Sequence, residues 1–181
     1  MLINRLIAAT LLASSLGPFA TLSYAECNSA LPQYTPTDRY NLLPESSPTS
    51  IQDNQTQLIW MRCSVGQTWD SSSQTCSQEA VLYDWPEAVS VANNHGSPWR
   101  LPNKKELASI IDFTCVEPAV NQSVFPSTAA NGYWTSTPQV YASSFSIWVI
   151  NFNSGNFSNG TLSDRFAVRL VKDAPQTPSN K

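Results

Sequence analysis

The stretch WRLPNKKELASIID, residues 99–112, carries the clearest structural signal in the chain. Pro102 disfavours helical geometry at the residue before it, so a helix that follows must begin after this proline. Asn103 can cap that helix, and Glu106 stands three residues later, where its carboxylate can reach back to the amide of the cap. The stretch therefore predicts a helix over residues 103–112 with a defined start.

The same helix is predicted to bury one apolar face. Leu107, Ile110 and Ile111 fall at positions i, i+3 and i+4, which lie on one side of a helix. Trp99 precedes the helix in an extended segment and is expected to pack against the same core. We therefore expect Trp99, Leu107 and Ile110 to be buried, together with Trp134 further along the chain.

The order of residues here resembles the start of the second helix of the Lcl C-terminal domain family, in which a Trp-Arg-Leu-Pro run precedes a polar cap and a Glu-Leu pair. Further motifs are similar to that family: the run 58–63 after an aspartate turn, Pro118–Asn121 with Phe125-Pro126, and the Tyr-Trp-Ser-type strand 132–137. Gln57 stands where the family's opening turn usually has glycine. The family is named after a bacterial collagen-like adhesin and is related to C-type-lectin-like and formylglycine-generating-enzyme folds.

The resemblance implies an α+β domain of C-type-lectin-like fold over residues 39–172, with two helices packed on twisted antiparallel strands. Residues 85–94 predict the first helix, with Pro86 in its first turn and His95-Gly96 as its end. The carboxy-terminal third predicts strands over 145–152 and 166–170, a turn at 153–155, and a hairpin turn at Asn159-Gly160.

Residues 1–25 have the pattern of a secretory signal peptide. Arg5 precedes an apolar run over 6–22, and Ser23-Tyr24-Ala25 resembles a cleavage site. A membrane anchor is the alternative, but Gly17-Pro18 interrupts a run already short for a span of about 20 residues. The sequence thus predicts a secreted, periplasmic or cell-surface protein with no stable membrane span after cleavage. Residues 26–38 are expected to form an amino-terminal strap and 173–181 a disordered tail.

Composition and charge argue against a nucleic-acid partner. The full chain has 10 Lys and Arg against 13 Asp and Glu, and removal of the signal with Arg5 leaves 9 − 13 = −4. Phosphate binding needs a basic face, which this balance does not provide. Six Trp, six Tyr and seven Phe among many Ser, Thr and Asn residues indicate instead a β-rich extracellular module suited to carbohydrate or protein contact.

The four cysteines, Cys27, Cys63, Cys76 and Cys115, follow the predicted cleavage site and indicate two disulfide bonds. Four cysteines allow three pairings. Cys63 and Cys76 bracket a short loop and form the natural local pair, which leaves Cys27 with Cys115. Zinc binding is the alternative, but the chain has no Cys-x-x-Cys pair and its single histidine, His95, has no cysteine nearby in sequence. We predict no metal and no cofactor.

The sequence contains few residues that could serve as catalytic groups. A nucleophile–histidine arrangement needs a presented histidine, whereas His95 is expected to end a helix. Formylglycine-generating enzymes depend on reactive thiols in their carboxy-terminal part, and no cysteine follows Cys115 here. Asp112, Glu117 and Asp164 leave open a carboxylate pair of the kind that glycosidases use. We therefore predict no catalytic residue, with an exported enzyme of formylglycine-generating-type fold as the alternative.

Calcium-dependent sugar binding is also not indicated. C-type lectins use a Glu-Pro-Asn type loop and a Trp-Asn-Asp strand as oxygen ligands. Here Glu117-Pro118 is followed by Ala119, and Trp148 is followed by Val149-Ile150-Asn151, so both halves are incomplete.

The remaining interpretation is a recognition or adhesion module that binds a cell-surface glycan or protein through its carboxy-terminal strand-loop face. Arg165 and Arg169 are the only cations in 145–171, which favours neutral sugars or protein epitopes over sulfated glycans. A structural envelope component without a specific ligand is the second alternative. Polar side chains around the predicted turns, with one aromatic ring, are the predicted ligand-binding residues: Trp148, Asn151, Asn153, Asn156, Ser158, Asn159, Thr161, Asp164 and Arg165.

Overall fold

The computed structural model describes residues 25–43, 49–141 and 144–175. The predicted signal peptide, except Ala25, and residues 176–181 of the predicted tail lie outside the described residues. The described chain contains two α-helices, one 3₁₀ turn and eleven strands. In chain order these are β1 (Glu26–Cys27), η1 (Thr37–Arg39), β2 (Tyr40–Leu42), β3 (Ser50–Asp53), β4 (Leu58–Met61), β5 (Thr68–Asp70), β6 (Thr75–Ser77), α1 (Trp85–Asn94), α2 (Lys104–Ala108), β7 (Cys115–Val116), β8 (Gly132–Tyr141), β9 (Ser144–Asn151), β10 (Asn156–Gly160) and β11 (Val171–Asp173).

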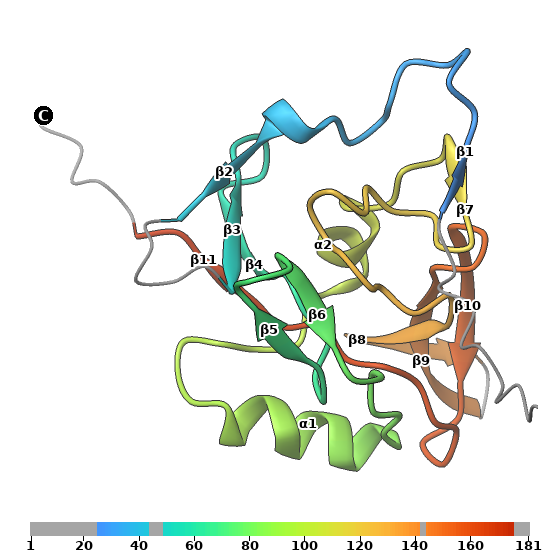
Figure 1. Cartoon of the computed structure of the whole chain (residues 1–181). Helices are drawn as coiled ribbons and strands as arrows, with labels where there is room; N and C mark the ends of the chain where they lie inside the picture. The colour runs from blue at the N-terminus through green and yellow to red at the C-terminus, as the bar shows by residue number, and fades with distance from the viewer. Residues whose placement is uncertain (1–24, 44–48, 142–143, 176–181) are drawn as a thin grey trace, which may run out of the picture.

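The strands form four antiparallel sheets. The largest has the order β11-β4-β3-β2, and a three-stranded sheet has the order β10-β9-β8. β1 pairs with β7, and β5 pairs with β6. Figure 1 shows the two larger sheets on opposite sides of the molecule, with α1 along its lower edge. This mixed architecture of mostly antiparallel strands with two helices agrees with the predicted α+β class.

Helix α1 spans the predicted residues 85–94 because local signals define both of its ends. Asp84 and Glu87 form a reciprocal capping box, with Pro86 in the first turn. At the other end His95 is the carboxy-terminal cap, and Gly96 adopts a φ of +93°, the left-handed conformation that glycine accepts without strain. Among the described residues neither helix is long and apolar enough to cross a membrane.

Helix α2 is shorter than predicted. Its start is as expected, because Asn103 and Glu106 form a capping box, but the helix ends at Ala108 instead of 112. Two contacts with the segment that follows draw residues 111 and 112 away from the helix. Ile111 forms a β-bridge with Val120, and the amide of Asp112 donates to the carbonyl of Ala119. The apolar face nevertheless forms as predicted, since Leu107, Ile110 and Ile111 are fully buried.

The core consists of two clusters. One surrounds Trp60, Leu107 and Phe125 and connects α2 to the four-stranded sheet. The other surrounds Trp134 and connects α1 to the three-stranded sheet. Trp134 is completely buried as predicted, whereas Trp99 is only half-buried at the margin of the second cluster. The prediction that Trp99 is a core residue is therefore wrong.

The hairpin turn expected at Asn159-Gly160 is also wrong. Both residues belong to β10, and the chain turns after them at 162–163. Gly160 serves a different purpose here. A Cβ atom at this position would lie 2.6 Å from Phe166 and 2.8 Å from Trp134, so the close approach of these two rings requires glycine. The preceding turn is as predicted, with the chain reversing over 152–155 between β9 and β10.

Both predicted disulfide bonds are present, Cys63–Cys76 and Cys27–Cys115. The first joins the end of β4 to the β5–β6 hairpin. The second joins β1 to β7, so that the amino-terminal segment, blue in Figure 1, runs across the top of the molecule from there to β2. At the other end of the chain β11 extends to Asp173 and Ala174 is buried, so the ordered structure continues past residue 172.

Candidate functional site

The residues predicted to bind a ligand are divided between the two ends of strand β10. Asn151, Asn153 and Asn156 lie around the turn at 152–155, where β9 leads into β10. Thr161, Asp164 and Arg165 lie in the loop that follows β10. Since β10 rises about 3.3 Å per residue, these groups stand roughly 13 Å apart. They do not form one cluster.

Several of these side chains stabilise their own loops. Asn151 Oδ1 accepts the amide of Asn153 at 2.9 Å, and Asp164 Oδ2 accepts the amide of Thr161 at 2.7 Å. Arg165 donates to the carbonyl of Leu82 at 2.7 Å and pairs with Glu87 at 3.1 Å. A side chain with an internal partner is less available to a ligand. Asn156 and Ser158, by contrast, are exposed and have no side-chain hydrogen bond within the described part of the chain.

Trp148 lies on the face of the three-stranded sheet that α2 covers. The ammonium of Lys104 sits 3.2 Å from the centre of the indole ring and 5.1 Å from the ring of Phe157. Asn159 stands opposite Trp148 across the strand pair, and its Nδ2 donates to Ser146 Oγ at 3.1 Å. One face of the indole is thus occupied by a cation–π contact, and a ligand that stacks on that face must displace Lys104.

Two exposed aromatic rings lie beside the turn at 152–155. Phe113 is 55% exposed and Tyr34 is 63% exposed, and the two rings meet edge to face with centroids 5.4 Å apart. The turn packs directly against them, since a Cβ atom on Gly155 would stand 3.4 Å from Phe113. The amide of Glu117 also donates to the carbonyl of Asn153 at 2.9 Å. We call Tyr34, Phe113, Asn153 and Asn156 the hairpin-end surface.

A buried carboxylate holds the two rings in place. Asp112 is completely buried, and its oxygens accept the amides of Tyr34 and Thr35, each at 3.3 Å, and the hydroxyl of Thr114 at 2.6 Å. Burial by itself raises the pKa of Asp112, but these hydrogen bonds outweigh it and hold the pKa below its ordinary value. The charged carboxylate therefore connects the strap that carries Tyr34 to the loop that carries Phe113.

Sequence reasoning did not identify Tyr34 and Phe113. Tyr34 lies in the strap and Phe113 in the segment after α2, and neither belongs to a periodic pattern. The available signal was an aromatic residue in each of two segments with no predicted buried face. What brings them together is the hydrogen bonding of Asp112 to the strap, a contact between residues 77 and 78 positions apart.

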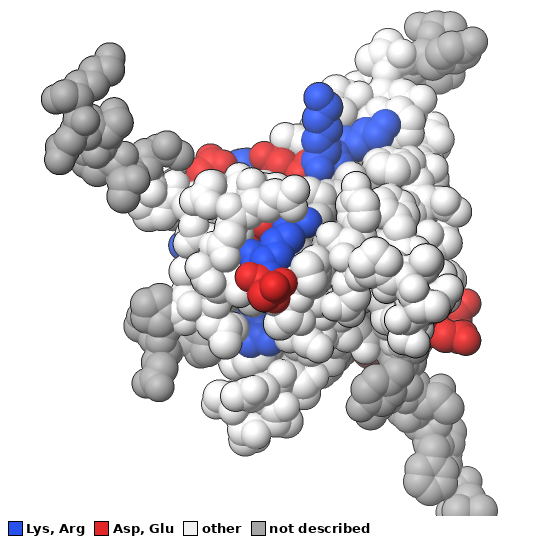
Figure 2. All heavy atoms as spheres, turned by 90° about the horizontal axis from the view of Figure 1, so that it is seen from above, with Lys and Arg blue, Asp and Glu red and all other residues white. Residues whose placement is uncertain are grey.

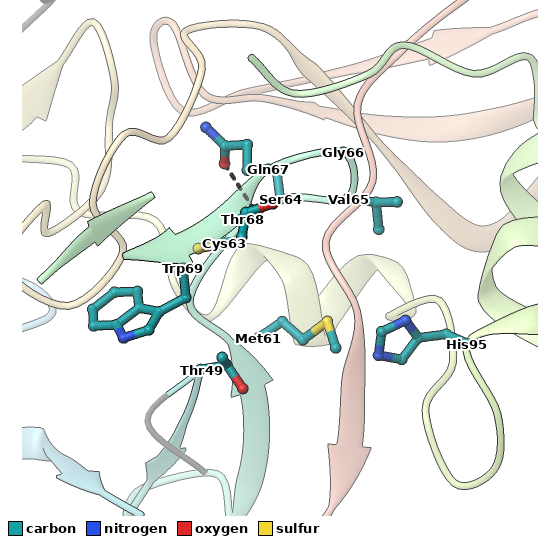
Figure 3. Close-up of a pocket in the computed structure, with 10 residues that line it drawn as sticks. All are labelled: Thr49, Met61, Cys63, Ser64, Val65, Gly66, Gln67, Thr68, Trp69 and His95. Atoms are coloured by element: carbon teal, nitrogen blue, oxygen red, sulfur yellow. Dashed lines mark hydrogen bonds between the residues drawn. The ribbon is translucent and has the colours of Figure 1, made fainter. Parts of the chain in front are cut away.

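A hollow of about 380 Å³ lies elsewhere, beside the β5–β6 hairpin. Figure 3 shows Met61 and His95 pointing toward each other across it, with Trp69 on the other side. Gln67 closes one wall by accepting the amide of Ser64 at 2.9 Å. The lining includes a thioether, an indole and an imidazole but no carboxylate. Three hydroxyl groups also line it, and that of Ser64 is hydrogen-bonded to the hydroxyl of Tyr133 at 2.8 Å.

The charges on the face shown in Figure 2 form small separate groups on a largely uncharged surface. Within the described ranges, no three His, Cys, Asp or Glu side chains come close enough together to hold a metal ion.

Of the comparisons with known proteins, only the one with protein families gives a match. No curated protein and no solved structure matches the chain. The family model described as the Lcl C-terminal domain matches residues 49–172, which is well over half of the sequence and runs from β3 into β11. The chain therefore belongs to the Lcl C-terminal domain family.

Proposed function

We propose that this protein is an exported, non-enzymatic recognition module that binds a cell-surface glycan or protein through the hairpin-end surface. The main support for this proposal is the pair of exposed rings, Tyr34 and Phe113, beside the asparagine-bearing turn at 152–155. Rigid aromatic rings offer contact area at low entropic cost, and amides beside them give adaptable hydrogen bonding. Large apolar side chains left exposed together commonly mark an interaction site.

The proposal also covers export and fold. Two disulfide bonds are typical of oxidising compartments, and they support secretion to the periplasm or cell surface after removal of residues 1–25. A C-type-lectin-like relation is proposed on the basis of family membership and of the antiparallel architecture. In such folds, loops on a rigid scaffold carry the recognition residues, as the strap and the hairpin turn do here.

Two of the three carboxylates considered for glycoside cleavage, Asp112 and Asp164, form hydrogen bonds within the fold. Asp112 is buried and hydrogen-bonded to the strap, whereas Asp164 lies in the loop beyond β10 and accepts from Thr161. Each has a structural partner. A glycosidase needs its two carboxylates to face each other across one bond of the substrate.

A binding screen tests the proposal. The chain from Glu26 to Lys181 is applied to arrays of glycans and bacterial and host surface proteins, and then compared with the variants Tyr34→Ser/Phe113→Ser and Asn153→Ala/Asn156→Ala. Loss of an aromatic anchor at an interface costs about 2 kcal/mol or more, so the first variant should bind at least about thirtyfold more weakly.

The matched control is Phe145→Ser. Phe145 is a similarly exposed phenylalanine near the start of β9, at the end of that strand away from the turn at 152–155. Its loss should leave binding unchanged. If Tyr34→Ser/Phe113→Ser binds as the unmodified chain does, the hairpin-end surface is not the site. Turnover of a bound sugar would contradict the non-enzymatic part of the proposal.

A further inference from the structure

A second hollow, of about 550 Å³, lies between α1 and the segment that leads into α2. Trp85 and Val89 of α1 form one wall and Leu101 forms part of the other. Trp85 is held by its indole nitrogen, which donates to the carbonyl of Thr135 at 3.4 Å. The volume lies within the range of about 300–1,000 Å³ that small-molecule sites occupy. The hollow shares no residue with the hairpin-end surface.

Neutral polar groups rim this apolar wall. Asn93, Asn103 and Ser136 line the hollow from three different segments and are all exposed. Asn103 uses its carbonyl oxygen to cap α2, accepting the amides of Lys105 and Glu106, so its amide hydrogens remain for a ligand. The side chains of Asn93 and Ser136 form no hydrogen bond to any described residue. An apolar wall with convergent polar groups is the usual composition of a small-ligand site.

The charges at the hollow are already compensated. Both outer nitrogens of Arg100 bind Glu106, at 2.8 and 2.9 Å, and one also binds Asp173 at 3.0 Å. One cation therefore faces two carboxylates, which leaves no free positive charge for an anion and a small excess of negative charge. This excess would repel an anionic ligand but not a neutral one.

We propose that this hollow binds one neutral sugar unit. The C–H face of the sugar ring lies against Trp85, Val89 and Leu101, and its hydroxyl groups exchange hydrogen bonds with Asn93, Asn103 and Ser136. The inference does not depend on the proposed function, because it uses different residues and a different face of the fold.

The test is a titration followed by NMR of the ¹⁵N-labelled chain from Glu26, which contains every described residue except Ala25. The probes are the methyl β-glycosides of glucose, galactose and N-acetylglucosamine, with glucuronate as the anionic counterpart. We expect the indole N–H signal of Trp85 to shift saturably with at least one neutral glycoside and not with glucuronate at equal concentration.

The informative variant is Asn93→Ala/Ser136→Ala, which removes two exposed polar groups without altering the packing. Each lost hydrogen bond weakens binding about fivefold, so the double change should raise Kd roughly 25-fold. Asn94→Ala is the matched control, because Asn94 is the next residue of α1, bonds to Ser90 and does not line the hollow. This control should bind normally, as should Tyr34→Ser/Phe113→Ser.

Three results would overturn the inference: no Trp85 shift with any neutral glycoside, equal binding of glucuronate, or unchanged affinity in Asn93→Ala/Ser136→Ala. Loss of binding in Tyr34→Ser/Phe113→Ser alone would place the sugar at the hairpin-end surface instead. In that outcome the proposed function stands and this second site does not.

Discussion

Arg169 is a buried arginine, although arginine side chains usually lie on the protein surface. Sequence reasoning counted it among the cations of the carboxy-terminal face, but it is completely buried. Its guanidinium donates to the backbone carbonyls of Met61 and Arg62 and to the hydroxyls of two further residues, Ser64 and Thr128. Burial lowers the pKa of Arg169, but arginine remains charged in proteins. The residue thus joins the end of β4 to the chain before β11.

Replacing Arg169 with Met should therefore destabilise the fold by about 3 kcal/mol or more, because several buried acceptors lose their donor at once. Arg165→Met is the control, since Arg165 is largely exposed and a surface pair of this kind is worth under about 1 kcal/mol. Urea unfolding of both variants measures the difference. Equal small losses would mean that Arg169 is not the structural link described above.

Gln57 stands where the resemblance predicts a glycine, and its backbone has a conformation that suits glycine. Its φ is +58°, in the left-handed region that side chains with a Cβ disfavour. The turn keeps its geometry because the amide of Gln57 donates to Asp53 O at 2.8 Å and its side chain donates to Asn54 O at 2.7 Å. These bonds hold a conformation that glycine would adopt more readily.

Gln57→Gly should consequently leave stability unchanged or raise it by up to about 1 kcal/mol, since the relieved backbone strain offsets the greater freedom of glycine in the unfolded chain. Gln55→Gly, in the same turn but without a positive φ, should lower stability by roughly 0.5–1 kcal/mol. Thermal unfolding of the two variants gives the comparison. A Gln57→Gly variant that is as destabilised as Gln55→Gly would show that the side-chain bonds dominate.

At the scale of elements, the starts of helices were predictable and some of their ends were not. Both capping boxes and Gly96 are local signals, and they define α1 completely and α2 at its start. The end of α2 depends on Val120 and Ala119, which follow it by about ten residues, and no local pattern shows this contact. Tyr34 and Phe113 were not identified from the sequence for the same reason, because Tyr34 reaches Phe113 only through the folded strap.

Asp112 links the end of α2 to that strap, so its charge should matter for stability. Because its pKa is lowered on folding, Asp112 stabilises the native state above the unfolded pKa of about 3.9, and this contribution is lost as the pH falls through the folded value. Asp112→Asn should cost about 2 kcal/mol at pH 7 through weaker hydrogen bonds. The difference between the two proteins should shrink below about pH 4.

Urea unfolding at a series of pH values measures this difference. A gap that stays constant from neutral to acidic pH would show that Asp112 is not the group whose titration destabilises the fold.

For the whole molecule, the amino-terminal segment is attached to the domain at few points. Cys27–Cys115 with the β1–β7 pair holds one end and β2 holds the other, with hydrogen bonds to Asp112 and Asn121 between them. Tyr34 lies on this segment, so the hairpin-end surface depends on how the segment is held against the domain. The sequence allowed the disulfide pairing to be predicted, but not that one bond secures the hairpin-end surface and the other a hairpin.

The two disulfides should therefore differ in effect. Replacing Cys27 and Cys115 with Ser opens a loop of 88 residues and should cost about 4–5 kcal/mol of stability in the chain-entropy description. Opening the 13-residue Cys63–Cys76 loop should cost about 3 kcal/mol.

Hydrogen exchange distinguishes the two variants further. The amides of Tyr34 and Thr35 should lose protection in the first variant and keep it in the second, because only the first releases the strap from Asp112. Protection of both amides in both variants would mean that Asp112, and not the disulfide, holds the surface together.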